Sequence, residues 1–363
     1  MRVAVLGAAG TIAPAIVRDL AESTEVDSIL LLDLDAERAV AVAEAQGAGK
    51  AAAAEADARS GLAGHLDGIA ALVNSASYRV NLDAMRACLE AGCHYLDLGG
   101  LYHLTGEQLE MGEEFEGAGL LAVLGIGSSP GKTNLMAARA VAELGGSAER
   151  IEVSAAGRDL DPPEGFSVPY ALHTLIDELT LPPVVLRDRT PVEIEPLSDG
   201  GVVEFGEPIG AAPTIHTLHS ELRTFAESFG CRECSFRLSL APALLERLRE
   251  LAAADKEEIE GAARTAGRPS AKTVSVHLVE AFAAGSRVRM RAVTGPHAAW
   301  GLGGGIVSTA SPAAAAVRLL ARGEVDARGV LPPERCLDPE LMFAELETRG
   351  CRFEVDVATE ARA

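Results

Sequence analysis

The chain has 363 residues, of which 48% are hydrophobic, enough for about two domains with sizeable cores. A formal net charge of −21 without any Lys/Arg run argues against nucleic acid and anionic membranes as partners, because both attract clustered basic side chains. We expect no membrane-spanning segment, because such a segment takes about 20 apolar residues. The first residues indicate a strand rather than a signal peptide. We expect a cytoplasmic enzyme that acts on a small molecule.

The first dozen residues predict the turn of a dinucleotide-binding fold. A short apolar run ending at Leu6 indicates a buried strand, and it leads into Gly7-x-x-Gly10-x-x-Ala13 and a helical pattern. In this motif the first glycine allows a sharp turn, the second lets the backbone approach a pyrophosphate, and the third small residue lets the helix pack on the sheet. The N–H groups at the helix start would bind the phosphates. The cofactor contacts expected here are Gly7, Ala9, Gly10, Thr11 and Ile12.

An acidic residue follows the second predicted strand, residues 28–32. Asp33 lies about 20 residues after the glycine motif, the spacing typical of a carboxylate that accepts from the ribose hydroxyls. Such a carboxylate repels a 2′-phosphate, and the nearest arginine is Arg38. The pattern favours NAD and leaves NADP possible. A glycine turn in an α/β fold that binds no dinucleotide is the alternative.

Two further strand ends are expected at the same cofactor. The predicted third strand, 51–57, ends where the adenine would lie, although a plain turn is the alternative there. The predicted fourth strand, 67–73, is followed by small residues that would leave room for the nicotinamide. The contacts expected from these two ends are Asp57, Ala58, Ser75 and Ala76.

An acid and two glycines end the next predicted strand, in Cys93-His-Tyr-Leu-Asp97-Leu-Gly-Gly100. Ligands of open α/β sheets bind outside the carboxyl ends of the strands, so Asp97 lies where chemistry is expected. A helix cap or a loop anchor is the alternative for this residue.

The stretch Gly125–Asn134 is similar to a P-loop, but the glycine spacing is one residue off in either direction. Pro130 also lacks an amide N–H that could cradle phosphate. ATP binding is therefore not expected, and Lys132 is interpreted either as a solvated residue at a helix start or as a ligand group.

From about residue 150 the pattern changes to successive alternating or β-branched runs, which predict a mostly antiparallel sheet. Helices are predicted near 169–180, 243–262 and 312–322. The fold class is thus α/β, a Rossmann doubly wound parallel sheet with an inserted α+β domain on a mostly antiparallel sheet. The predicted division is a Rossmann domain (1–130), the inserted domain (131–305) and a C-terminal segment that returns to the Rossmann domain (306–363).

Neither cysteines nor histidines predict a metal site. The six cysteines are scattered, and Cys231-x-x-Cys234 lacks the second pair that a zinc site needs, so plain thiols are expected. His216 and His219 with Glu221 could imitate metal ligands, but two residues between the histidines is not a zincin spacing.

Several stretches together resemble the saccharopine dehydrogenase family, and the ending resembles the branch that includes lysine 6-dehydrogenase. The resemblance spans nearly the whole chain, and its more specific parts are Tyr-x-Asp-x-Gly-Gly and Pro-Gly-x-x-Asn. The stretches are Gly7–Gly10, Asn74–Tyr78, Cys93–Gly100, Gly127–Asn134, His216–Thr224, Leu331–Arg335 and Arg349–Phe353.

The resemblance implies a nicotinamide cofactor, an inserted domain used for substrate and dimer contacts, hence a homodimer, and oxidation of a C–N bond in an amino-acid substrate. The stretch 216–224 departs from the lysine enzymes, which are richer in Gly and Ser there. Saccharopine, L-lysine (as for an L-lysine 6-dehydrogenase) and a carboxyalkylated polyamine therefore all stay open as substrates. A catalytically silent Rossmann regulator is the alternative from another class.

The implied reaction needs a base, since only a neutral amine gives up hydride readily. Asp97 is the first candidate for base or ammonium partner and His219 the second, with Tyr78 a further candidate at the same sheet edge. Arg79 or Arg223 could bind a substrate carboxylate through a bidentate pair. Further substrate contacts are expected at Gly100, Pro130 and Asn134. Tyr170 and His173 begin a predicted helix of the inserted domain and could line the cleft.

Overall fold

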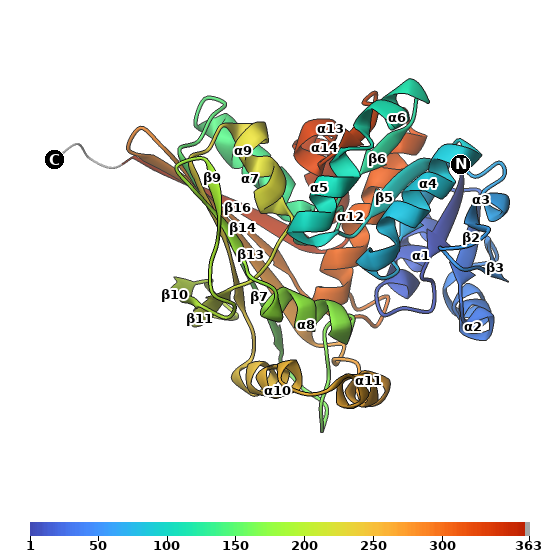
Figure 1. Ribbon diagram of the computed structural model, residues 1–363, viewed down its shortest axis with the longest axis horizontal. Helices are drawn as coiled ribbons and strands as arrows, with labels where there is room; N and C mark the ends of the chain where they lie inside the picture. Colours follow the sequence, from blue (N-terminus) through green and yellow to red (C-terminus); the bar gives the residue numbers. More distant parts are fainter. Residues whose placement is uncertain (360–363) are drawn as a thin grey trace. The chain divides into compact units, whose positions relative to one another are not determined.

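A computed structural model describes residues 1–359 of the chain, which divide into two compact units. The first unit comprises residues 1–132 and 309–338, and the second comprises 133–308 and 339–363, of which those up to 359 are described. Figure 1 traces the chain from β1 in blue to β16 in red.

The first unit is built on a seven-stranded sheet in which every pair is parallel. The strand order β15-β6-β5-β4-β1-β2-β3 reverses direction at β1, next to β4. This reversal is the switch point at which doubly wound sheets bind ligands. The strands are β1 (Arg2–Leu6), β2 (Ser28–Asp33), β3 (Ala51–Glu55), β4 (Ala71–Asn74), β5 (His94–Asp97), β6 (Leu121–Val123) and β15 (Gly329–Leu331).

The central strands of this sheet are buried on both faces. Val3, Ala4 and Val5 of β1 have no exposed surface, so the strand shows a continuous apolar run rather than an alternating pattern. Such burial is typical of a parallel sheet covered by helices on both sides. The helices of this unit are α1 (Ala13–Glu22), α2 (Ala36–Gln46), α3 (Leu62–His65), the 3₁₀ helix η1 (Tyr78–Val80), α4 (Asn81–Ala91), α5 (Leu101–Leu109), α6 (Gly112–Gly117) and α13 (Pro333–Cys336).

The second unit is built on a nine-stranded mixed sheet with the path β10-β11-β12-β7-β13-β14-β16, and β8 and β9 joined to it through β12. Its pairs are antiparallel except for β12 with β7. The strands are β7 (Arg150–Asp159), β8 (Val184–Arg187), β9 (Thr190–Glu193), β10 (Asp199–Glu204), β11 (Ala211–His216), β12 (Glu233–Ser239), β13 (Thr273–Ala283), β14 (Ser286–Thr294) and β16 (Cys351–Thr359). The helices are α8 (Leu172–Thr180), α9 (Glu221–Phe229), α10 (Pro242–Ala252), α11 (Lys256–Thr265) and α14 (Pro339–Glu347).

The chain passes between the units three times: within α7 (Lys132–Glu143), within α12 (Gly304–Ala321) and directly before α14. α12 corrects one expectation, because its 18 residues with a mean hydropathy of 1.2 are long and apolar enough to cross a membrane. However, 72% of this stretch is buried inside the protein, as in a core helix. The predicted helix at 312–322 is also wrong in its start, since Pro312 lies inside α12.

Two other predictions are wrong in detail. The segment 306–363 does not return as a whole to the first unit, because β16 pairs with β14 along nine residues and extends the second sheet (Figure 1). The predicted helix 243–262 is two helices, since the Asp255 side chain accepts from the N–H of Glu258 and caps a new helix, α11.

Candidate functional site

The glycine turn after β1 has the geometry that the motif requires. Gly7 has φ +76°, and a Cβ on it would lie 2.5 Å from the backbone nitrogen of Ala76. Its N–H donates to the Leu32 carbonyl at 2.8 Å, and its own carbonyl accepts from the N–H of Gly10 at 3.0 Å. Only glycine fits at position 7, because the β4 loop approaches the turn backbone to backbone.

The Asp33 carboxylate is held at the end of β2 by backbone donors. Its Oδ2 accepts from the N–H of Ala9 at 2.9 Å and its Oδ1 from the N–H of Asp35 at 2.9 Å. Each oxygen keeps a second lone pair that can accept from a ribose hydroxyl. Arg38 donates to the Ala9 carbonyl at 2.9 Å, so a guanidinium that can bind a 2′-phosphate lies at the same turn.

The remaining residues expected to contact the cofactor lie around this turn. α1 begins at Ala13, directly after Thr11 and Ile12, and its first turn carries no acidic side chain that would oppose a pyrophosphate. At the end of β4, Ser75 donates its N–H to the Leu6 carbonyl at 2.9 Å. The glycine turn, the helix start and the Asp33 carboxylate therefore fit a dinucleotide.

Asp57 and Ala58 are half-buried after β3. The Asp57 carboxylate accepts from the N–H of Arg59 at 2.9 Å, so it shapes a turn at the position where adenine contact is expected.

Asp97 is 1% exposed, and its carboxylate accepts four hydrogen bonds. Oδ1 accepts from the N–H groups of Gly99 at 2.9 Å and Gly125 at 2.7 Å. Oδ2 accepts from the side-chain amides of Asn81 at 3.1 Å and Gln108 at 2.7 Å. A carboxylate offers about four lone-pair positions, so these donors saturate it.

Burial raises the pKa of the Asp97 carboxyl, and the bonds from Gln108 and Gly125 partly offset that rise. The network continues through Asn74, whose amide donates to Asn81 at 2.9 Å and to the Tyr95 hydroxyl at 3.1 Å. We therefore propose that Asp97 anchors the loops after β5 and β6, the alternative that the sequence left open, rather than acting as the base.

Tyr78 and Arg79 follow the β4 end in the helix η1. The ring of Tyr78 is half-buried, Arg79 is exposed, and the guanidinium carbon lies 5.2 Å from the ring centroid. A phenol and a guanidinium therefore stand beside each other next to the loop expected at the nicotinamide.

The segment from Gly125 to Lys132 is packed tightly rather than open for phosphate. Pro130 lies against Gly99 and Gly125, and a Cβ on either glycine would come within 2.9 Å of the proline ring. Gly100 is buried at the start of α5. Lys132 is 1% exposed, so its interpretation as a solvated residue is wrong.

His219 lies in the second unit, at the centre of a second buried polar group. Its Nδ1 is 3.4 Å from Glu221 Oε2 and its Nε2 is 3.9 Å from Glu178 Oε2. The ring stacks on Phe236 with a centroid distance of 3.5 Å and an interplanar angle of 22°. Both ring nitrogens thus face carboxylates, but within residues 1–359 Nε2 makes no hydrogen bond.

The other predicted site residues of the second unit are separate from this group or on its border. His216 pairs its Nδ1 with the Phe236 carbonyl at 3.1 Å, Arg223 is exposed on α9, and Asn134 is buried in α7. Within residues 1–359 no three His, Cys, Asp or Glu side chains are grouped so that they could hold a metal ion.

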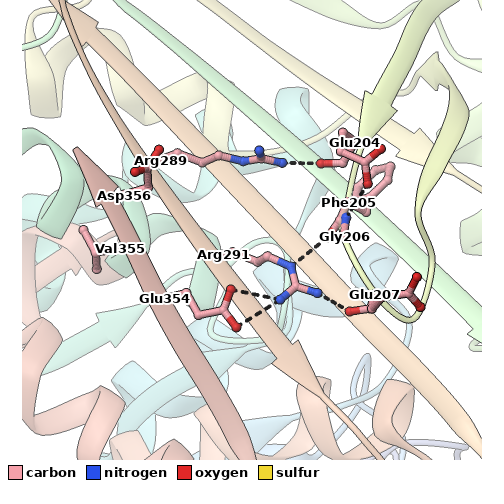
Figure 2. A pocket seen from close by; sticks show the side chains of 9 residues that line it. All are labelled: Glu204, Phe205, Gly206, Glu207, Arg289, Arg291, Glu354, Val355 and Asp356. Atoms are coloured by element: carbon pink, nitrogen blue, oxygen red, sulfur yellow. Dashed lines mark hydrogen bonds and ion pairs between the residues drawn. The ribbon is translucent and has the colours of Figure 1, made fainter. Parts of the chain in front are cut away.

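The second unit also contains a pocket of about 510 Å³ at the tip of the β10–β11 hairpin. Figure 2 shows Arg289 and Arg291 reaching from β14 to the hairpin backbone. Arg291 donates to the Phe205 carbonyl at 2.7 Å and pairs with Glu354 at 3.0 Å, and Arg289 donates to the Glu204 carbonyl. The arginines are therefore used to fasten the hairpin, and no predicted site residue lines this pocket.

The residues that contact Asp97 and His219 were not identified from the sequence. Asn81 and Gln108 saturate Asp97, and Glu178 faces His219 from α8. One feature of the sequence could have indicated them. Gln108 and Glu178 are polar residues on the buried faces of amphipathic helices, where a polar side chain needs a hydrogen-bonding partner.

Comparisons with known proteins agree with the fold and the cofactor turn. Residues 3–123 match the family described as the saccharopine dehydrogenase NADP binding domain. A carboxyaminopropylagmatine dehydrogenase from Synechocystis sp. is 26% identical over 200 residues, which cover 53% of this chain and 50% of that protein. The chain thus matches only about half the length of this curated relative.

A saccharopine dehydrogenase (L-Glu forming) from Saccharomyces cerevisiae, in its apo form, superposes with a TM-score of 0.71. The match covers 99% of this chain and 100% of that one at 14% identity, so it shows the fold alone. Together these matches confirm the predicted resemblance to the saccharopine dehydrogenase family, the α/β fold class and NAD(P) as the cofactor.

Proposed function

Because the chain carries the NADP binding domain of the saccharopine dehydrogenase family, we propose that it is an NAD(P)-dependent dehydrogenase that oxidises the amine-bearing carbon of an amino-acid substrate. The observation that carries this proposal is the complete dinucleotide turn, with Gly7 pressed against the β4 loop and Asp33 fixed by two backbone donors. The two relatives reported above are both named for amines that carry carboxylates, which supports the C–N bond as the point of attack.

The proposed chemistry divides between the cofactor and the residues at the sheet edge. The bound nicotinamide supplies the hydride acceptor. Asp33 and the glycine turn would hold the adenosine and the pyrophosphate, and Arg79 or Arg223 is the proposed partner of a substrate carboxylate. With Asp97 saturated and both nitrogens of His219 facing carboxylates, the phenolate form of Tyr78 is the proposed group that would accept the proton of the substrate ammonium and become the neutral phenol.

The first experiment is a pair of fluorescence titrations with NADH and NADPH, followed by a panel of saccharopine, L-lysine and carboxyaminopropylagmatine. We expect saturable binding of a reduced cofactor and turnover of one amine in the panel. Turnover of L-lysine alone would assign an L-lysine 6-dehydrogenase. Failure to bind either cofactor would contradict the proposal.

Tyr78→Phe tests the proposed proton acceptor. We expect kcat to fall about 10²-fold or more, as for loss of a general base, while the dissociation constant of NADH and the melting temperature stay at wild-type values. A kcat within a factor of three of wild type would remove Tyr78 from the mechanism.

The second candidate function is a Rossmann regulator that binds the cofactor and has no catalysis. It is favoured by the burial of both candidate bases, Asp97 and His219. Saturable NADH binding with no turnover of any amine in the panel would support it. We also propose that the protein is cytoplasmic and forms a homodimer. Light scattering of the purified chain would test the dimer through its molar mass.

A further inference from the structure

Five side chains of the second unit form a row of neighbouring polar groups, called here the His219 cluster: the half-buried Tyr170 and the buried Glu178, His219, Glu221 and Thr133. The Tyr170 hydroxyl donates to Glu178 Oε2 at 2.5 Å, and Glu178 faces His219 Nε2. His219 Nδ1 faces Glu221, whose other oxygen accepts from the Thr133 hydroxyl at 2.8 Å. The cluster therefore joins the loop before α8 to the first turn of α7.

The protonation state of His219 decides whether this cluster holds together. A neutral imidazole donates from one nitrogen only, whereas the imidazolium donates from both. Glu178 and Glu221 lie on opposite sides of the ring, and stacking on Phe236 keeps the ring from turning away. If the His219 imidazolium lost one proton, that ring nitrogen would present a lone pair to the carboxylate of Glu178 or Glu221. Two buried acceptors facing each other cost free energy unless that carboxylate moves away.

The groups that face the cluster from each packed element favour the imidazolium. α8 contributes Glu178 and Asp177, and α9 contributes Glu221. β12 contributes Cys234, a thiol whose pKa burial raises well above its usual value, so it stays neutral. For His219, burial lowers the pKa, but the hydrogen bond and charge of Glu221, together with the charge of Glu178, outweigh burial and raise it.

The far end of the cluster lies at the segment expected to contact substrate. Thr133 is the second residue of α7, directly before Asn134, which is 2% exposed. The side chain of Glu221 is fully buried, and its Oε1 accepts from the Thr133 hydroxyl. A displacement of Glu221 would therefore be passed to the first turn of α7 and to Asn134.

We propose that His219 is a positioning residue for the dehydrogenase reaction: as an imidazolium it holds Glu178 and Glu221 together and so fixes the first turn of α7 through Thr133. The part that concerns substrate rests on the proposed function. The coupling between His219 and α7 stands on the contacts alone.

The sign of the pH dependence follows from the raised pKa. The folded-state pKa of His219 lies above its unfolded value of 6.5, so the stabilisation is fully present below pH 6.5. It is lost as the pH rises through the folded-state value. We therefore expect the first turn of α7 to loosen and KM for the amine to rise on the alkaline side, with kcat changing less.

The test combines hydrogen exchange with steady-state kinetics on the full chain. The amides of residues 136–140 donate to carbonyls of the first turn of α7. After correction for the intrinsic exchange rate, their protection should fall as His219 loses its proton. In His219→Gln and Thr133→Val the protection should be reduced at every pH and lose its pH-dependent step, and KM for the amine should rise about tenfold (1.4 kcal/mol).

Thr133→Ser is the matched control, since it keeps the hydroxyl and should restore both readouts, and the NADH dissociation constant should stay unchanged in all variants. Thr133→Val changes a single hydroxyl, so it serves if His219→Gln does not fold. A wild-type protection profile that shows no step as the pH rises above 6.5, or one unchanged in Thr133→Val, would overturn the proposal. Absence of turnover with an intact exchange step would instead reject the dehydrogenase function alone.

Discussion

Replacing Asp97 separates its two proposed roles, because an anchor and a base fail differently. Asp97→Ala removes the acceptor of four donors, two from the backbone of Gly99 and Gly125 and two from the amides of Asn81 and Gln108. Gly99 and Gly125 follow the carboxyl ends of β5 and β6, and Asn81 and Gln108 lie on the helices α4 and α5. An anchoring role therefore predicts loss of stability, whereas a base predicts loss of kcat alone.

The magnitude follows from the number of orphaned donors. Each buried donor left without a partner costs about 1–3 kcal/mol, and water entering the space recovers part of the sum. We expect Asp97→Ala to lower the free energy of unfolding by about 3–5 kcal/mol. In Asp97→Asn one oxygen still accepts from the backbone, and Gln108 can rotate so that its Oε1, which has no hydrogen-bond partner among residues 1–359, faces the new amide. That variant should lose about 1–2 kcal/mol.

Urea unfolding at constant pH measures these differences, with NADH titration on the same samples. Asp67→Ala is the matched control, because Asp67 is exposed in the same unit and its removal should stay within about 0.5 kcal/mol. If Asp97→Ala keeps its stability within about 1 kcal/mol of wild type and loses kcat by about 10²-fold, the anchoring argument is refuted and Asp97 is the base.

Three further substitutions test the cofactor turn and the core of the first unit. Asp33→Ser removes the charge that repels a 2′-phosphate, so the NADPH to NADH affinity ratio should rise about tenfold, 1.4 kcal/mol, in parallel titrations; an unchanged ratio would contradict this role. Gly7→Ala places a Cβ at φ +76° and 2.5 Å from the Ala76 nitrogen, so calorimetry should show NADH binding weakened more than about tenfold, and wild-type affinity would be the contrary result. Arg318→Met leaves the buried Asp19 carboxylate without the guanidinium 2.7 Å away and should cost about 3–5 kcal/mol in urea unfolding. The double variant Arg318→Met with Asp19→Asn should recover part of that loss in the free energy of unfolding. If the losses of the two single variants simply add in the double variant, the pairing of Arg318 with Asp19 is refuted.

The parts of the fold that the sequence predicted are those encoded by local patterns. The glycine turn, the strand that follows it and the acid at position 33 lie within one βαβ unit, so their spacing alone predicts the cofactor edge. The inserted sheet was predicted from its alternating runs. β16 was assigned to the wrong unit, because an alternating run shows that a strand exists but not which sheet edge it joins.

The candidate bases were harder to assign, since their roles depend on long-range contacts. Asp97 is bonded to Gln108 and Gly125, which lie 11 and 28 residues away in the sequence. His219, in the loop before α9, faces Glu178 on α8. A sequence pattern marks such residues as chemically capable, but only packing shows which donors and acceptors have already taken their lone pairs. Buried polar groups collect partners during folding because an unmet one is costly.

Both candidate bases, Asp97 and His219, are buried, and this limits how the chain could transfer a proton during amine oxidation. A base must exchange its proton with substrate and then with solvent in each cycle, so at least one of its lone pairs must stay accessible. Asp97, with four donors and 1% exposure, lacks that accessibility, and His219 is 6% exposed, with Glu178 and Glu221 facing its two ring nitrogens. Tyr78, whose side chain is half-buried, lies beside the exposed guanidinium of Arg79 after the β4 end. We therefore propose that proton transfer takes place at the segment after β4 and not at Asp97 or His219, the two residues that the sequence ranked first.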